Sequence, residues 1–150
     1  MNNSLPEKGS SIKEIYPSAR DIIFERPLFL SGVSAGFPSP ADDYLDRKLD
    51  LNEHLVKNPA STFFVRVAGD SMTGAGINDN DILVVDRSLE PSSNNIVIAI
   101  VNGELTVKRL LKTRGSCCLV AENPAYPPME IDRETPLEIW GVATYAIHTL

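Results

Sequence analysis

The second half of the chain has the hydrophobic pattern of β-strands. From Thr62 onward, short apolar runs rich in Val, Ile and Phe are separated by turns that contain Gly, Asn, Asp or Pro. Asn102-Gly103 stands between two of these runs and predicts a tight hairpin. The pattern predicts strands at 62–68, 81–86, 95–101, 104–111, 117–122 and 137–147. We therefore expect a mainly β body.

Two helix-start patterns precede the predicted strands. Ser39 is followed by Pro40 and by two aspartates, which favours a short helix that runs to about Arg47. Asp50-Leu51-Asn52-Glu53 is typical of a capping box and predicts a second short helix, which Asn58-Pro59 ends. We expect a buried stripe on this second helix, formed by Leu51, Leu55 and Val56.

Residues 1–35 are interpreted as an arm, and 36–150 as the folded body. The first eleven residues are polar and contain Pro6 and Gly9, so we expect them to be mobile. The stretch from Ser31 to Gly36 has small side chains, which are typical of a flexible linker. Small side chains also suit a segment that must lie extended in a cleft, and both descriptions stay open. Together the predicted elements indicate an extended N-terminal arm, a short helical segment and a β body.

The charge of the chain is unevenly placed. Residues 1–35 are neutral, so the net charge of −6 lies wholly in 36–150. An acidic body cannot neutralise phosphates, which argues against direct nucleic-acid binding. The N-terminus lacks the pattern of a signal peptide, and no apolar run approaches the ~20 residues that span a bilayer. We therefore expect a cytoplasmic protein without a membrane anchor.

Candidate chemistry begins at Gly69-Asp70-Ser71-Met72, directly after the strand predicted at 62–68. A serine at such a corner can point its hydroxyl out of the sheet, while neighbouring amide N–H groups are free to meet an oxyanion. The same residues are also typical of an ordinary turn at a strand end. The sequence around Ser71 alone leaves both interpretations open.

A serine nucleophile needs a base, and the sequence offers two kinds. His54 and His148 have no local context that marks either as a base. Lys108, on the strand predicted at 104–111, can serve if burial keeps its amine neutral. Its strand alternation places it on the face opposite Leu105 and Val107. Taken alone, it is better interpreted as an ordinary lysine on the polar face of an amphipathic strand.

No pattern in the sequence predicts a metal or cofactor site. Asp79, Asp81 and Asp86 lack the glycine and the terminal glutamate of a calcium loop, so a turn before a buried strand is the better interpretation. Cys117 and Cys118 are adjacent, which disfavours a disulfide between them. We interpret them as reduced residues on a strand.

Three stretches in order, 63–72, 76–86 and 103–110, resemble the UmuD/LexA family of self-cleaving Ser-Lys proteins, and most closely its UmuD branch. The resemblance implies a LexA/UmuD-like β body, with Ser71 as nucleophile and Lys108 as base. It also implies self-cleavage between Ala35 and Gly36, since Ala35-Gly36-Phe37-Pro38 is similar to the family's cleavage region. The longer N-terminal tail, and alanine where relatives often have cysteine before the cut, depart from the family pattern.

The resemblance further implies a homodimer, and cleavage stimulated by a RecA filament on single-stranded DNA. The shortened form is then expected to join a UmuC-like Y-family polymerase in error-prone lesion bypass during the SOS response. An alternative is a non-enzymatic β-rich interaction module in which Ser71 and Lys108 are inert. A third, a truncated phage-type repressor, requires specific DNA binding, which the acidic body disfavours.

Overall fold

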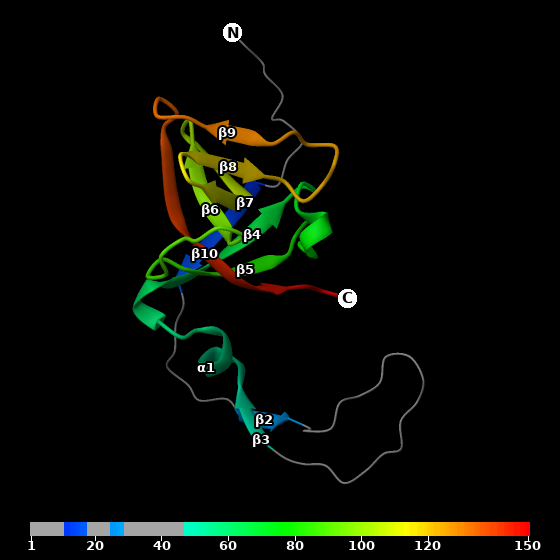
Figure 1. Cartoon of the computed structure of the whole chain (residues 1–150). Helices are drawn as coiled ribbons and strands as arrows, with labels where there is room; N and C mark the ends of the chain where they lie inside the picture. Colours follow the sequence, from blue (N-terminus) through cyan, green and yellow to red (C-terminus); the bar gives the residue numbers. More distant parts are fainter. Residues whose placement is uncertain (1–10, 18–24, 29–46) are drawn as a thin grey trace.

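The computed structural model describes residues 11–17, 25–28 and 47–150 (Figure 1). Short helical segments lie between the third and fifth strands: α1 at Leu51–Leu55 and two 3₁₀ turns at Pro59–Ser61 and Thr73–Ala75. The strands are β1 Ser11–Pro17, β2 Glu25–Leu28, β3 Arg47–Asp50, β4 Thr62–Ala68, β5 Ile82–Asp86, β6 Ile96–Val101, β7 Glu104–Thr113, β8 Ser116–Val120, β9 Met129–Ile131 and β10 Leu137–Ile147. The expected mainly β fold is therefore confirmed. Each predicted strand from Thr62 onward is present, with ends shifted by a residue or two.

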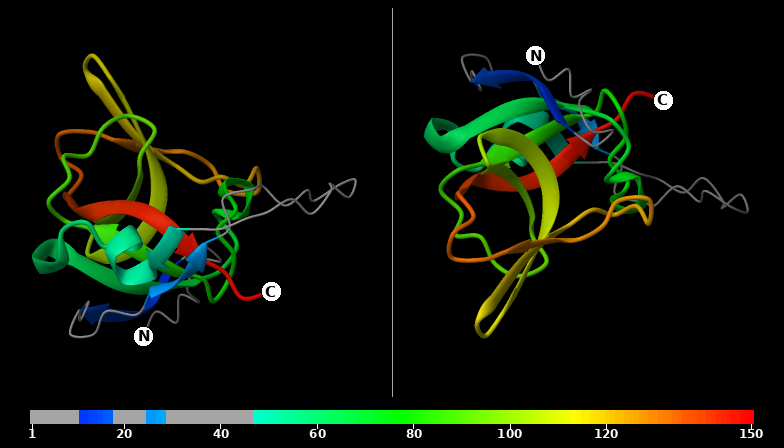
Figure 2. Two further views of the ribbon diagram at one scale, coloured as in Figure 1. Left: turned by 90° about the horizontal axis from the view of Figure 1, so that it is seen from below. Right: turned by 90° about the horizontal axis from the view of Figure 1, so that it is seen from above.

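The main sheet is antiparallel and has the order β1-β4-β5-β10-β6-β7-β8-β9. β10 occupies its middle, pairing with β5 along one edge and β6 along the other. Register shifts in β10 at both pairings mark irregularities of the bulge type, which bend a strand and increase its twist. Figure 2 shows the sheet curling round, and β1 also contacts β7, which is not its hydrogen-bonded neighbour.

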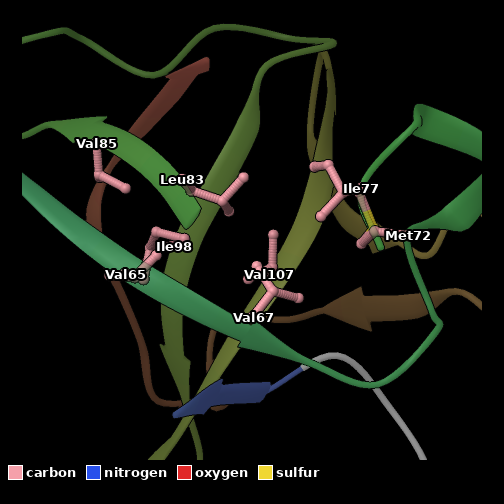
Figure 3. Close-up of a cluster of buried hydrophobic side chains, with 8 residues drawn as sticks. All are labelled: Val65, Val67, Met72, Ile77, Leu83, Val85, Ile98 and Val107. Carbon is pink, nitrogen blue, oxygen red and sulfur yellow. The ribbon is translucent and has the colours of Figure 1, made fainter. Parts of the chain in front are cut away.

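Curling lets the sheet bury apolar residues in two clusters. The first cluster lies around β4, β5 and β7 and comprises Val65, Val67, Met72, Ile77, Leu83, Val85, Ile98 and Val107 (Figure 3). The second contains Val97, Ala99, Val101, Leu110, Leu119 and Val142. β6 and β7 contribute to both clusters, because successive residues of a strand point to opposite faces. The near-continuous apolar run of β6 follows from this burial on both sides.

α1 begins where the capping pattern predicts. The carboxylate of Asp50 accepts hydrogen bonds from the N–H groups of Asn52 and Glu53, at 2.9 and 3.4 Å. The expected buried stripe is wrong at Leu51, which is 59% exposed, whereas Val56 is buried. A helix of five residues makes little more than one turn, and none of its residues is buried. The helix predicted at 39–47 lies outside the described residues except for Arg47, which belongs to β3.

The arm contributes a strand that the sequence pattern did not predict. β1 pairs antiparallel with β4, with Ser11 opposite Ala68 and Pro17 opposite Phe63. Farther along, β2 and β3 form a separate two-stranded ribbon. The expected cleavage site at Ala35 and Gly36 lies outside the described residues. In the part of the chain that the structure describes, no helix is long and apolar enough to cross a membrane.

Gly141 gives a test of this packing. It lies at a register shift of β10, and a Cβ added there would stand 2.7 Å from Val85 Cγ1 and 3.1 Å from the Asp86 carbonyl oxygen. We expect Gly141→Ala to lower the free energy of unfolding by about 1–3 kcal/mol because the sheet must shift to admit the methyl group. Urea unfolding measures the change, with Glu138→Ala on the same strand as the control. Equal stability of the Gly141→Ala variant and the wild type would contradict this packing.

Candidate active site

Ser71 lies in a tight turn at the end of β4. Gly69 has a φ of 92°, a left-handed conformation that glycine adopts without strain. Ser71 itself is fully buried, and so is Met72, whose side chain belongs to the first apolar cluster. A 3₁₀ turn follows, with the N–H of Ala75 donating to the carbonyl of Met72 at 3.0 Å. The core thus fixes the backbone immediately beside the serine.

The structure brings Lys108 to Ser71. The two residues are far apart in sequence, yet Lys108 Nζ lies 3.1 Å from Ser71 Oγ. The amine also lies 3.0 Å from Thr106 Oγ1 and 3.2 Å from the carbonyl oxygen of Val107. Thr106 precedes Lys108 by two residues, so both side chains project from the same face of β7. The expected meeting of Ser71 and Lys108 is therefore present, and Thr106 is a partner that the sequence did not reveal.

The surroundings of Lys108 favour its uncharged form. Burial lowers the pKa of the Lys108 amine, because removing an ammonium ion from water costs free energy. Its contacts with Ser71, Thr106 and Val107 are with hydroxyl and carbonyl oxygens, which carry no full charge to offset that cost. A neutral amine has two N–H donors and one lone pair. Thr106 and the Val107 carbonyl can accept the N–H groups, which directs the lone pair to the Ser71 hydroxyl.

Both histidines make other contacts. His148 Nδ1 lies 2.7 Å from a carboxylate oxygen of Asp81, which is itself 2% exposed. The ring of His54 packs against that of Tyr145, with centroids 5.7 Å apart. These contacts agree with the sequence interpretation, in which neither histidine is marked as a base.

The connection between β8 and β9 supports the Ser71 turn from outside. Asn123 Nδ2 donates to the Asp70 carbonyl oxygen at 2.9 Å, and the Tyr126 hydroxyl donates to the Asp70 carboxylate at 2.5 Å. The N–H of Gly74 donates to the carbonyl of Glu122 at 2.7 Å. A Cβ on Gly74 would lie 2.5 Å from that oxygen, so the close approach requires glycine. No local sequence pattern marks these partners, because the contacts join residues about fifty positions apart.

Asp79 supports the turn from the other side. Its Oδ1 accepts a hydrogen bond from the N–H of Gly69 at 2.8 Å. This bond is the main cause that lowers the pKa of the Asp79 carboxyl, and nearby Lys13 adds to the effect. Lys13 Nζ lies 3.4 Å from the same oxygen. A residue of the arm therefore contacts the carboxylate that holds the start of the Ser71 turn.

The acidic and cysteine residues considered for a metal site have structural roles. Asp81 accepts from the N–H of Asn78 at 2.8 Å, and Asp86 accepts from the N–H of Ser88 at 2.8 Å, as expected for turns. Cys117 and Cys118 are free thiols on β8. Among the described residues, no group of three or more His, Cys, Asp or Glu side chains is placed to hold a metal ion.

Comparison with known proteins identifies the family of this chain. The model of the family described as Peptidase S24-like matches residues 27–144, which include both Ser71 and Lys108. The chain belongs to the Peptidase S24-like family. Self-cleaving serine peptidases are among the members of this family. The predicted membership of the UmuD/LexA group is thereby confirmed.

Several curated members of the group are similar over most of their length. The chain is 47% identical over 122 residues to Protein MucA of Salmonella typhimurium, covering 81% of this chain and 83% of that protein. It is 45% identical over 135 residues to Protein SamA of Salmonella typhimurium, covering 89% and 93%. The LexA repressor of Photorhabdus laumondii is 37% identical over 116 residues, covering 77% of this chain and 57% of the repressor. These matches place the chain on the UmuD-like side of the family.

The lowered pKa of Lys108 predicts how stability depends on pH. An ordinary lysine has a pKa of about 10.4. Between the lower pKa of the folded state and that value, the unfolded chain binds more protons, so the free energy of unfolding rises with pH. Lys108→Met should flatten this rise, whereas Met in place of the exposed Lys57 should leave it in place. Urea unfolding from neutral pH to pH 10 measures the slopes. The same slope in all three proteins would contradict a buried, readily deprotonated Lys108.

Proposed function

We propose that this chain is a self-cleaving serine peptidase that cuts its own Ala35–Gly36 bond, with Ser71 as the nucleophile and Lys108 as the general base. The observation that carries the proposal is the 3.1 Å contact between Ser71 Oγ and Lys108 Nζ. The full burial of Ser71 and the lowered pKa of Lys108 support it, because a neutral amine at a hydroxyl can take its proton.

The proposed reaction has two stages. Lys108 takes the proton of Ser71, the serine oxygen attacks the Ala35 carbonyl carbon, and backbone N–H groups near the turn stabilise the oxyanion. The C–N bond to Gly36 then breaks, Lys108 returns the proton to the leaving amine, and an ester joins Ser71 to Ala35. In the second stage, neutral Lys108 activates a water molecule that hydrolyses this ester. Because enzyme and scissile bond share one chain, the bond is present at high local concentration.

The wider role that we propose follows the UmuD-like relatives. The shortened form, residues 36–150, acts as a dimeric accessory subunit of a UmuC-like Y-family polymerase in error-prone lesion bypass of the SOS response. Cleavage is stimulated by a RecA nucleoprotein filament in the cytoplasm. The similarity to MucA and SamA over more than four fifths of each protein supports this role. The acidic body supports a protein that works near DNA through other proteins rather than by binding DNA itself.

Replacement of either member of the pair tests the chemistry. We expect Ser71→Ala and Lys108→Ala each to slow self-cleavage at least about 100-fold, because each removes an essential group. Wild-type cleavage should accelerate with rising pH and level off below the pKa of an ordinary lysine, since burial lowers the pKa of Lys108. Intact-protein mass spectrometry after incubation at pH 7 to 10 measures the product that begins at Gly36.

The control is Lys112→Ala, which removes an exposed lysine from the same strand. It should cleave at the wild-type rate. Equal shortening of the wild type and both active-site variants would refute the pair. An intact wild type at every pH and in the presence of a RecA filament would favour the alternative, a non-catalytic β-rich interaction module of a DNA-damage polymerase complex.

Tyr126 gives a separate test of how the nucleophile is positioned. Tyr126→Phe removes the hydroxyl that donates to Asp70, next to Ser71. We expect cleavage to slow about five-fold, the scale of one lost hydrogen bond, while the pH at half-maximal rate stays unchanged because Lys108 is untouched. Tyr145→Phe, on β10, is the matched control and should cleave normally. An unchanged rate for Tyr126→Phe would show that this bond does not position the serine.

A further inference from the structure

β1 covers what would otherwise be an open edge of the main sheet. In the strand order, β4 has β5 on one side and β1 on the other. Without β1, the backbone N–H and C=O groups along that side of β4 would have no strand partner. Such an edge is a template for binding an extended segment. The segment that fills it here, Ser11–Pro17, belongs to the arm rather than to the body.

Polar side chains fasten β1 to the body. Arg66 Nε donates to Glu14 Oε2 at 2.7 Å, joining β1 to β4. Lys13 Nζ donates to Asn80 Oδ1 at 2.8 Å and lies 3.4 Å from Asp79. These contacts favour one register, because a shift of β1 by one residue would move Lys13 and Glu14 away from their partners on the body.

Apolar contact adds to the pairing. Ile12 is partly buried and packs against the first apolar cluster, which includes Val67 of β4 and Val107 of β7. β1 also contacts β7, the strand that carries Lys108. β1 therefore closes the side of the curled sheet between β4 and β7.

The arm has a second link to the body, but it is the weaker one. β2 pairs with β3 in a ribbon of two strands, and an exposed ion pair joins Lys48 to Glu25 at 3.8 Å. An isolated two-stranded ribbon is marginally stable in water, and an exposed ion pair contributes little. The strength with which the arm is held should therefore depend on β1.

We propose that the free edge of β4 is a strand-binding site whose occupant is Ser11–Pro17, and that this strand stays bound after the chain is cut between the arm and the body. The proposal rests on the proposed function, which supplies the cut at Ala35–Gly36. Cutting the chain and uncovering the β4 edge are then two separate events. The edge becomes available only when β1 dissociates.

The experiment uses the full chain with its own cleavage disabled. A recognition sequence for a site-specific protease is inserted between Gly32 and Val33 of the Ser71→Ala variant, so that the cut does not depend on Ser71. After cutting, size-exclusion chromatography and native mass spectrometry should show the arm fragment and the body as a one-to-one complex. Because the cut is supplied from outside, this result is independent of whether the unmodified chain cleaves itself.

Variants identify the contact that retains the arm. Ile12→Asp should speed dissociation of the cut arm at least about ten-fold, through loss of apolar burial. Glu14→Arg and Arg66→Glu should each speed it about three-fold, and the double variant, which exchanges the charges, should restore retention. Lys48→Glu is the control on the other ribbon and should have no effect.

Two results would overturn the proposal. One is separation of the arm from the body as soon as the protease cuts. The other is retention that is lost with Lys48→Glu and unchanged with Ile12→Asp, which would assign the holding contact to β2 and β3. If Ile12→Asp prevents folding, the variants at Glu14 and Arg66 still decide the test, because neither residue lies in the apolar core.

Discussion

The partial burial of the Lys108 amine is the constraint on which the candidate site depends. Lys108 Nζ is partly buried against Ser71, and the contacts described at the amine are with uncharged oxygens. In that setting the ammonium form loses solvation without gaining a counter-ion, so its pKa falls. A lysine with an acidic neighbour at the same place would remain charged and would have no lone pair for the serine. The absence of full charge on Ser71, Thr106 and the Val107 carbonyl is therefore as important as their proximity.

The curling of the sheet brings Ser71 and Lys108 together. Ser71 follows β4, whereas Lys108 lies on β7, and β5, β10 and β6 separate these strands in the hydrogen-bonded order. In a flat sheet, strands so far apart in order would be about 19 Å apart. Curling, with bulge-type irregularities in β10, brings their faces together around the first apolar cluster. Met72 is buried in that cluster, so the same packing that closes the sheet also fixes the serine turn.

The turn is further held by groups from two separate parts of the chain. Asn123 and Tyr126 bind Asp70, and Asp79 binds the N–H of Gly69. Asp79 is in turn contacted by Lys13 of β1. The arm and the serine turn therefore share a carboxylate. In our proposal the arm is at once the part that is cut away and a strand that completes the sheet.

The sequence by itself determined the local elements and the candidate chemistry. Runs of β-branched residues predicted the strands, Asn102-Gly103 predicted the hairpin, and Asp50 predicted the helix cap. In the structure both Asn102 and Gly103 have a positive φ. Motif resemblance singled out Ser71 and Lys108. The strands, the hairpin and the helix cap depend on neighbouring residues, whose steric and hydrogen-bonding preferences act without the rest of the fold.

Only the tertiary structure decided which distant groups meet. It placed Lys108 against Ser71, gave Asp70 its partner Tyr126, paired β1 with β4 and left Leu51 exposed. None of these has a local pattern, because each depends on how strands far apart in sequence pack. Burial is a property of that packing, and so is the lowered pKa of Lys108. The candidate residues can be inferred from the sequence, but their contact and the lowered pKa of Lys108 depend on the fold that buries Ser71 and part of Lys108.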